Sequence, residues 1–357
     1  MPRVSDPSVP ADFWPGILFR LTAGQSLSRE EAAQALGVIM RGEATPAQTA
    51  GLLMALRTKG EVVDELEGFA ATALEFARPV RHSGPVLDTC GTGGDRRGTF
   101  NVSTLAALVS AAAGATVAKH GNRAASSHCG SADLLEALGV KVDLGPNGVE
   151  RCMAEAGIGF MFAPVFHPAA AHAMSVRREL RVPTVFNFLG PLTNPARPSA
   201  QIVGVSDERM LPLVAEVLAR RGTRALVFRS HDGLDELSTT SPALVVEAQG
   251  GDVRTYELDP ADHGFARATL SDLEGGDVER NAELARAVLD GEPGPKRDVV
   301  VLNAAAALQV AGLAESLEAG ADLAASAIDA GKAAEVLERW VAVSQQAAEA
   351  EASEPAR

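Results

Sequence analysis

Aromatic residues are scarce in this chain: Phe, Trp and Tyr together make up 4% of its 357 residues. A platform that stacks nucleic-acid bases needs several aromatic faces in one place, so neither such a platform nor an aromatic cage is expected. Basic residues are also fewer than acidic ones. The chain has 32 Lys and Arg and 46 Asp and Glu, which gives a formal net charge of -14. That charge repels polyanions, which argues against nucleic acid or an anionic membrane as the main partner.

Cysteines and long apolar runs are also few. Cys90, Cys129 and Cys152 lack the spacing of a metal site or a disulfide framework, so we expect them to be buried in a reducing compartment. The first dozen residues lack the apolar segment of a secretory signal, and no uninterrupted apolar stretch is long enough to span a bilayer. The sequence therefore predicts a cytoplasmic protein.

The first eighty residues are rich in helix signals. Ser28–Glu31 reads as a capping box, and Thr45 followed by proline opens a helix over Gln48–Lys59. A third amphipathic helix is expected over Val62–Ala73. Three short helices cannot bury all their apolar faces alone, so we expect them to pack on later helices or on a second subunit.

From Val86 onward, short apolar segments alternate with Ala- and Leu-rich helical segments such as Val102–Ala113 and Glu208–Arg221. This alternation predicts an α/β domain with a mostly parallel central sheet. The proline-rich stretch Arg181–Pro198 predicts an ordered, kinked crossing. The expected strands are Val86–Asp88, Thr116–Lys119, Val140–Val142, Gly159–Phe162, Gln201–Val205, Arg224–Arg229 and Ala243–Glu247.

These patterns divide the chain into parts. We expect a small helical domain over residues 1–80, completed by about 168–198, and a larger α/β domain over 81–167 and 199–345 that carries the active site. Residues 346–357, rich in Ala and Glu, are expected to form a flexible tail.

Two polar, glycine-rich segments follow two of the predicted strands. The first runs from Asp88 to Asp95 and on to Thr104, and the second runs from Lys119 to Asp133. Glycines let backbone N–H groups approach an anion, and the hydroxyls and the lysine add further donors. Two such segments at successive strand ends predict a substrate with more than one phosphate group.

The first segment fails the two best-known nucleotide fingerprints. Gly91 and Gly93 begin a G-x-G pattern, but Arg96 breaks it, and Thr99 stands where a P-loop requires lysine. Taken alone, the segment fits an anion site and a tight turn with hydroxyl caps equally well. In the second segment a helix cap and a solvated lysine explain Ser131 and Lys119, but not the density of polar residues between them.

Eight motifs in order resemble the anthranilate phosphoribosyltransferases of tryptophan biosynthesis, over nearly the whole chain. They are DTCGTGGD (88–95), TFNVST (99–104), KHGNR (119–123), SS-x-x-GSAD (126–133), FAP-x-FHPA (162–169), VRREL (176–180), FN-x-LGPLTNP (186–195) and GLDELS (233–238). The resemblance implies a nucleoside-phosphorylase-like phosphoribosyltransferase fold, a homodimer formed through the helical domain, and Mg2+. It also implies transfer of a 5-phosphoribosyl group from phosphoribosyl pyrophosphate (PRPP) to the amine of anthranilate, and allows for an anthranilate synthase subunit as a partner.

The resemblance also implies site residues, none of them an acid–base catalyst or a nucleophile. Those expected to bind PRPP are Gly91, Gly94, Asp95, Thr99, Asn101, Val102, Ser103, Thr104, Lys119, Ser127 and Ser131. Those expected to meet anthranilate are Gly91, His120, Asn122, His167, Arg177 and Pro191. Those expected to organise Mg2+ are Ser103, Asp235 and Glu236, oxygen ligands of the kind that this ion prefers.

The chain departs from the family pattern at three places, which are Arg181 with Pro183, Ala170 with Ala171, and His128 with Cys129. The first two changes bear on the hinge and on the channel for the aromatic substrate. The third removes a phosphate contact, so it bears on affinity and not on reaction type. Two alternatives stay open, a pyrimidine nucleoside phosphorylase and a non-catalytic paralogue that binds nucleic acid.

Overall fold

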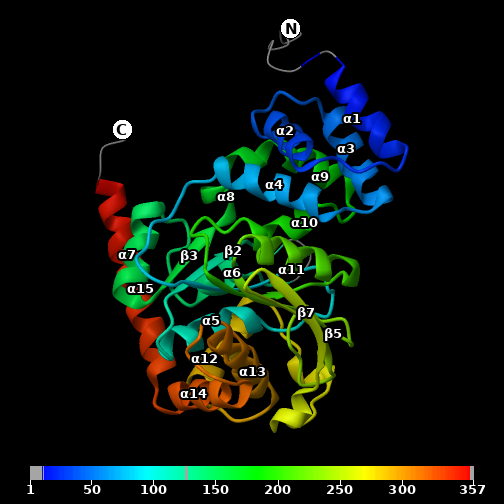
Figure 1. Cartoon of the computed structure of the whole chain (residues 1–357). Helices are drawn as coiled ribbons and strands as arrows, with labels where there is room; N and C mark the ends of the chain where they lie inside the picture. Colours follow the sequence, from blue (N-terminus) through cyan, green and yellow to red (C-terminus); the bar gives the residue numbers. More distant parts are fainter. Residues whose placement is uncertain (1–9, 11, 125–127, 354–357) are drawn as a thin grey trace. The chain divides into compact units, whose positions relative to one another are not determined.

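A computed structural model describes residues 10, 12–124 and 128–353 (Figure 1). The chain divides into two compact units, Met1–Arg78 with His167–Thr193, and Pro79–Phe166 with Asn194–Arg357. We call them the helical unit and the α/β unit. Of the helices in the described ranges, none is both long and apolar enough for a bilayer span.

The helical unit is built from two parts of the chain. Its first part forms α1 (Phe13–Thr22), α2 (Arg29–Met40), α3 (Pro46–Lys59) and α4 (Val63–Glu75). Its second part forms η1 (Pro168–Ala170), α9 (Ala171–Leu180), α10 (Phe186–Leu189) and η2 (Gly190–Leu192). Helix α1 was not among the expected helices, because Pro15 and Gly16 lie in its first turn and weaken the helix signal.

The predicted caps are confirmed. The Glu31 N–H donates to Ser28 Oγ over 3.2 Å, and the Ser28 N–H donates to Glu31 Oε2 over 2.9 Å. Thr45 and Gln48 form the same reciprocal pair at the start of α3. Such a cap contributes about 1 kcal/mol of stability by satisfying N–H groups that the first helical turn leaves open.

The α/β unit contains one sheet of seven strands in the order β3-β2-β1-β4-β5-β6-β7. The strands are β1 (Leu87–Gly91), β2 (Val117–Gly121), β3 (Ile158–Phe162), β4 (Ala200–Gly204), β5 (Arg224–Ser230), β6 (Ala243–Gln249) and β7 (Asp252–Leu258). The first five run parallel, with Leu87 opposite Val117 on one side and Ala200 on the other. Strands β6 and β7 are antiparallel additions. The mostly parallel sheet is thus confirmed.

Helices complete this unit. They are α5 (Val102–Ala112), α6 (Ser131–Ala137), α7 (Pro146–Ala156), α8 (Ala163–Phe166), α11 (Leu211–Arg220), α12 (Val278–Leu289), α13 (Pro295–Val310), α14 (Leu317–Asp329) and α15 (Lys332–Ser353), with short 3-10 turns η3 (Glu208–Met210), η4 (Pro260–His263) and η5 (Leu270–Leu273). Small residues let helices α13 and α14 approach each other closely. Ala304–Ala307 of α13 is fully buried, and a Cβ at Gly320 of α14 would lie 2.6 Å from the Ala305 carbonyl oxygen.

Two expectations about strands are corrected. Val140–Val142 is a buried loop and not a strand, because the Lys141 N–H donates to Ser344 Oγ of α15 and not to a neighbouring strand. Strand β7 was not expected, because most of its residues are exposed and no apolar face marks it. The signal for it was Gly250-Gly251, a two-residue turn in which both glycines have positive φ.

The expectation of a flexible tail over 346–357 is wrong for residues 346–353, and 354–357 lie outside the described residues. Helix α15 continues to Ser353, with Ala347 buried. Glu351 accepts hydrogen bonds from the N–H groups of Gly145 and Gly148, each over 3.0 Å, where α7 begins. A carboxylate at a helix N-terminus is stabilising, which fixes the end of α15 beside α7 (Figure 1).

Candidate active site

The order of the strands reverses direction at β1. From β1 the chain crosses through α5 to β2 on one side, whereas β4 lies on its other side and leads to β5. In open α/β sheets, ligands bind beyond the carboxyl ends of the strands at such a switch point. The crevice expected here lies above Gly91 of β1 and Gly204 of β4.

Two glycines let a later segment of the chain cross these strand ends. A Cβ at Gly204 would overlap the backbone carbonyl of Asp235, and a Cβ at Gly91 would overlap its carboxylate. The Gly93 N–H donates to Asp235 Oδ2 over 2.6 Å. The GLDELS segment, which follows β5, is thereby held against the first glycine-rich segment.

The start of α5 connects the same groups from a second side. The Ser103 N–H donates to Glu236 Oε1 over 3.1 Å, and Lys119 Nζ donates to Ser103 Oγ over 3.4 Å. Lys119 Nζ also donates to the Thr89 carbonyl oxygen over 2.6 Å. The structure therefore brings Ser103, Lys119, Asp235 and Glu236 together, as the sequence predicted for one site.

Electrostatic repulsion is concentrated at the acid pair. Burial raises the pKa of Asp235, and repulsion from Asp95 raises it further. Burial and the charge of Asp235 likewise raise the pKa of Glu236. Burial lowers the pKa of Lys119, against the attraction of Asp88. The crevice thus holds more acidic groups than it can neutralise, which is the environment of a cation site.

Two polar atoms at the start of α5 have no internal hydrogen bond. Asn101 Oδ1 and Thr104 Oγ1 are buried and lack a partner within the described ranges. The other side of the Asn101 amide donates to the Cys129 carbonyl oxygen over 3.0 Å, which brings the second glycine-rich segment against the first. Buried polar groups of this kind are normally satisfied by a ligand, an ion or water.

The second segment differs from expectation in its cap. Ser131 is the first residue of α6, and its Oγ donates to the Asn122 carbonyl oxygen over 3.2 Å. Asp133 is the cap instead, since its Oδ2 accepts from the N–H groups of Gly130 and Ala124, each over 2.9 Å. Ser127 lies outside the described residues.

The remaining residues expected at the site in this unit have different surroundings. Gly94 has a positive φ of 85°, and Asp95 Oδ1 accepts from the Arg97 N–H over 3.2 Å, so both shape the loop after β1. Thr99 forms an isolated bridge with Glu274, whereas the Val102 side chain is packed in the core and leaves only its backbone for a ligand. His120 is buried at the end of β2.

Arg177, His167 and Pro191 belong to the helical unit. Arg177 is half-buried: its guanidinium lies 5.2 Å from the Phe186 ring, burial lowers its pKa, and it has no ion pair within the described ranges. Its neighbour Arg178 is exposed. His167 and Pro191 are buried.

One residue at the crevice was missed by the sequence reasoning. Ser206 follows β4; its Oγ donates to the Gly93 carbonyl oxygen over 2.7 Å, and its N–H donates to Thr92 Oγ1 over 3.0 Å. The available signal was its place two residues after an apolar strand that ends in glycine, close to the place that Thr92 and Asn122 hold directly after β1 and β2.

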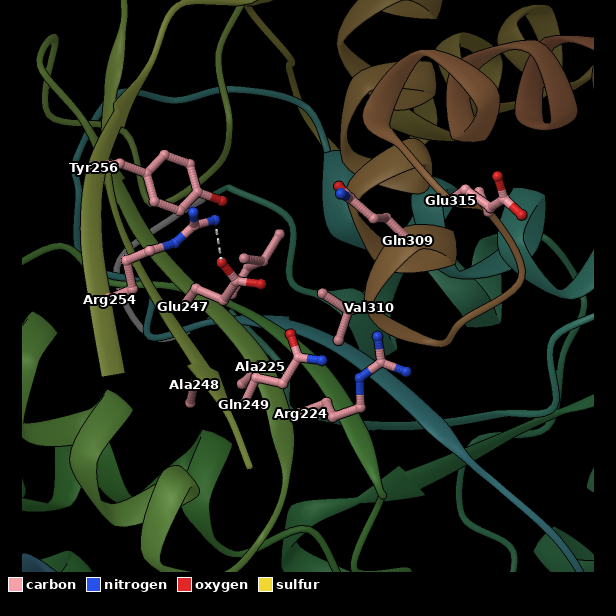
Figure 2. Close-up of a pocket in the computed structure, with 12 residues that line it drawn as sticks. Arg224, Ala225, Glu247, Ala248, Gln249, Arg254, Tyr256, Gln309, Val310 and Glu315 are labelled. Atoms are coloured by element: carbon pink, nitrogen blue, oxygen red, sulfur yellow. Dashed lines mark hydrogen bonds and ion pairs between the residues drawn. The ribbon is translucent and has the colours of Figure 1, made fainter. Parts of the chain in front are cut away.

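A cavity of about 410 Å³ lies elsewhere in the α/β unit and contains none of the expected site residues (Figure 2). It is lined by Arg224 at the start of β5, by Glu247 and Arg254, which pair over 2.7 Å, by Tyr256, and by Gln309 near the end of α13. Because β5 enters the sheet here and reaches the crevice only at Ser230, this cavity lies at the opposite strand edge from the glycine-rich segments.

Each of the two units matches a domain of a known protein family. The helical bundle domain of a glycosyl transferase family matches residues 15–77, and the a/b domain of a glycosyl transferase family matches residues 83–334. An anthranilate phosphoribosyltransferase from Moorella thermoacetica is 55% identical over 90% of this chain and 96% of its own length. The chain belongs to the anthranilate phosphoribosyltransferase family.

Solved structures of anthranilate phosphoribosyltransferases share the fold. The enzyme from Thermus thermophilus is 48% identical and superimposes with a TM-score of 0.88, covering 92% of this chain and 99% of that one. The Saccharomyces cerevisiae enzyme, solved in complex with PRPP and Mg, is 27% identical with a TM-score of 0.87, over 94% of this chain and 99% of that one.

The acid pair fits the Mg2+ that the family implies. No group of three or more His, Cys, Asp or Glu within the described ranges is arranged to hold a metal ion without help. Mg2+ is commonly bound by one or two carboxylates together with substrate phosphates and water. Asp235 is buried, its neighbour Glu236 is half-buried, and both have raised pKa values, so the pair matches that requirement.

Proposed function

We propose that this chain transfers the 5-phosphoribosyl group of PRPP to the amine of anthranilate, giving N-(5-phosphoribosyl)anthranilate and pyrophosphate in tryptophan biosynthesis. The observation that carries the proposal is the convergence of Lys119, Ser103 and the Asp235–Glu236 pair at the strand switch point. It supplies cationic, hydroxyl and acidic groups for a metal-bound diphosphate. Family membership, with 55% identity to a named anthranilate phosphoribosyltransferase, selects this reaction over the nucleoside phosphorylase and the nucleic-acid-binding paralogue.

PRPP would lie along the first glycine-rich segment and the start of α5. Asn101 Oδ1 and Thr104 Oγ1 lack internal hydrogen-bond partners among the described residues, and together with Lys119 they would bind PRPP. Gly91, Gly94, Asp95, Thr99, the Val102 backbone and Ser131 would shape or complete the pocket, with Ser127 as a further proposed contact. The N-terminus of α5 adds its dipole, which favours an anion.

Mg2+ would be held by Asp235, Glu236 and Ser103 together with diphosphate oxygens. The bound ion supplies charge stabilisation for the departing pyrophosphate. The protein contributes the fixed carboxylates, which Gly93 and Ser103 orient through their backbone N–H groups.

Anthranilate would be bound by its carboxylate, with Arg177 as the partner. A half-buried guanidinium without an ion pair in the described ranges is suited to a planar carboxylate. Asn122, His120, His167, Pro191 and Gly91 would line the path of the aromatic ring.

No residue is proposed as general base or nucleophile. The aniline-type amine of anthranilate is already neutral at pH 7, so its lone pair can attack the anomeric carbon directly. The bond from that carbon to pyrophosphate breaks, and the amine proton is released to solvent. Lys119 would stabilise the charge on the leaving group, and the binding residues would supply the correct geometry.

We further propose a cytoplasmic homodimer formed through the helical unit, with an anthranilate synthase subunit as a further partner. Phe19 of α1 is 75% exposed, and a cavity of about 530 Å³ is lined by residues of α1 and α3, including Leu21, Met54 and Ala55. Apolar surface of this kind marks an interface.

The experiment is to follow anthranilate fluorescence with the purified protein, PRPP and Mg2+. We expect anthranilate consumption that requires both PRPP and the metal. A protein that leaves anthranilate untouched but cleaves pyrimidine nucleosides with phosphate would contradict the proposal. Binding of nucleic acid without any turnover would contradict it as well.

A further inference from the structure

Asn303 is a polar residue in the middle of a buried apolar helix. Every residue of α13 from Val299 to Leu308 is buried, and the side chains of this run other than Asn303 are Val, Leu and Ala. Burying an amide without hydrogen bonds is unfavourable, so a fold that keeps one in its core supplies partners for it. The partners of Asn303 therefore indicate what this residue does.

Asn303 binds both backbone polar groups of Leu237. Its Oδ1 accepts from the Leu237 N–H over 3.1 Å, and its Nδ2 donates to the Leu237 carbonyl oxygen over 2.7 Å. Nδ2 also donates to the Val299 carbonyl oxygen of its own helix over 2.8 Å, which uses the second amide hydrogen. Leu237 is fully buried and directly follows Glu236, one of the two acids proposed to bind Mg2+.

Ser230, at the end of β5, binds the residues on either side of Leu237. Its Oγ donates to the Glu236 carbonyl oxygen over 2.7 Å and accepts from the Ser238 N–H over 3.2 Å. Ser230 and Asn303 are both completely buried, and we call the two side chains the backbone clamp. The peptide groups from Glu236 to Ser238 are thus tied to a strand on one side and to a helix on the other.

The two acids of the metal site are held by different means. Asp235 lies directly against Gly91 and Gly204. Glu236 has the clamp at its backbone, and its carboxylate accepts from the Ser103 N–H over 3.1 Å. One hydrogen bond to the carboxylate does not fix a long side chain by itself, because a rotation of the peptide groups at its base would move the carboxylate away. The clamp prevents that rotation.

We propose that Ser230 and Asn303 are positioning residues for the metal site. They fix the peptide groups that carry Glu236, so that its carboxylate meets the ion and the diphosphate without a rearrangement of the loop. Loss of groups that orient a metal-binding carboxylate typically weakens metal binding roughly 10- to 100-fold. This role rests on the proposed function, since it requires Glu236 to be a ligand of Mg2+.

A purely structural role predicts a different outcome. If the clamp only stabilised the fold, its loss would lower the Tm and leave metal binding unchanged. If the clamp acts through Glu236, its loss weakens metal binding, and this effect disappears once Glu236 has been replaced by Gln. A double-mutant cycle separates the two roles.

The experiment measures the dissociation constant of pyrophosphate by calorimetry, without Mg2+ and with saturating Mg2+. The ratio of the two constants is the metal enhancement of binding. We expect Ser230→Ala to reduce the metal enhancement roughly tenfold or more, with metal-free binding near the wild-type value. In the variant that combines Ser230→Ala with Glu236→Gln, the metal enhancement should be no smaller than in Glu236→Gln alone.

Ser344→Ala is the matched control for Ser230→Ala. Ser344 is equally buried, donates to the Val341 carbonyl oxygen and accepts from the Lys141 N–H, each over 3.0 Å. Its replacement should lower the Tm and leave the metal enhancement unchanged. Asn303→Ala removes the other half of the clamp and should reduce the metal enhancement as Ser230→Ala does. It also decides the question if Ser230→Ala does not fold.

Three results would overturn the inference. They are an unchanged metal enhancement in the clamp variants, an equal loss of pyrophosphate affinity with and without Mg2+, and fully additive effects of Ser230→Ala and Glu236→Gln. A wild-type protein whose affinity for pyrophosphate does not depend on Mg2+ would instead contradict the proposed function.

Discussion

Two adjacent arginines of α9 differ in their surroundings. Arg177 is half-buried against Phe186, whereas Arg178 is exposed and donates to the Met174 carbonyl oxygen over 3.4 Å. The sequence alone did not separate them, because both are the same residue type in the same VRREL motif. Burial does separate them, since a desolvated guanidinium binds a carboxylate more strongly than a hydrated one.

Replacement of Arg177 by Ala should raise the KM for anthranilate roughly tenfold to hundredfold. The reason is that hydrogen bonds to a charged group contribute about 1.5–3 kcal/mol. The KM for PRPP should change much less. Arg178→Ala is the matched control and should leave both constants near the wild-type values. Equal increases in both KM values for Arg177→Ala would reassign this residue.

The acid pair gives a second prediction at this scale. Asp235→Asn combined with Glu236→Gln should abolish the rise in Tm that Mg2+ with pyrophosphate produces in the wild type, and should strongly reduce turnover. The metal-free Tm should not fall, because the change removes buried like charges. Glu208→Gln, an exposed acid after β4, should keep the full response to the metal. A normal magnesium response in the double variant would exclude the metal role.

The sequence predicted the site residues by type and order but not their surroundings. Lys119 was predicted as a phosphate ligand because it ends a predicted strand, and Ser103 because it lies at the start of the helix after the first glycine-rich segment. Ser206 could be recognised only when β1 and β4 were placed side by side, since its partners Thr92 and Gly93 lie more than 100 residues away in the chain. Long-range pairing of this kind leaves no local pattern.

At the scale of elements, α15 illustrates how composition misleads. Its last two turns are rich in Ala and Glu, which is typical of a fraying end, yet Glu351 binds two backbone N–H groups at the start of α7. Similarly, β7 is exposed on most of its length and carries no apolar face, so only its glycine turn indicated it. Elements with a clear period or cap, such as α2 and α3, were predictable.

Glu351→Ala should reduce the free energy of unfolding by about 1–2 kcal/mol, the usual cost of losing a charged cap. Glu351 contacts the start of α7 and no residue of the proposed site, so the kinetic constants should stay the same. Glu349→Ala is the matched control, since Glu349 is an exposed acid of the same helix. Denaturant unfolding measures both, and equal stability of the two variants would contradict the capping role.

The first turn of α14 gives a pH prediction. The hydrogen bond from His263 over 2.6 Å, helped by Ser316, lowers the pKa of Glu318 to about 2. A carboxylate with a lowered pKa adds stability above its unfolded pKa of about 4.5 and loses it as the pH falls toward 2. The Tm difference between the wild type and Glu318→Gln should therefore be present at pH 6 and vanish near pH 2. Glu315→Gln, an exposed acid nearby, should show no such dependence.

At the scale of the whole molecule, the helical unit leaves apolar surface open. Phe19→Asp should weaken self-association roughly tenfold or more, because a buried Phe side chain contributes about 1.5–3 kcal/mol and each copy would supply one. Light scattering on a dilution series measures the oligomeric state. Val253→Asp, at an equally apolar exposed position of β7, is the control and should leave it unchanged. A monomeric wild type would contradict the proposed homodimer.

The crossing of Asp235 over Gly91 and Gly204 has a consequence for how sequences of this kind diverge. A side chain at Gly204 would displace the Asp235 backbone, and one at Gly91 would displace the Asp235 carboxylate. A relative with alanine at either position therefore cannot hold Asp235 as this chain does, even if every acid, serine and lysine of the motifs is intact. If Asp235 binds the metal as proposed, a side chain at either glycine marks, in a genome sequence, a relative that has lost the reaction.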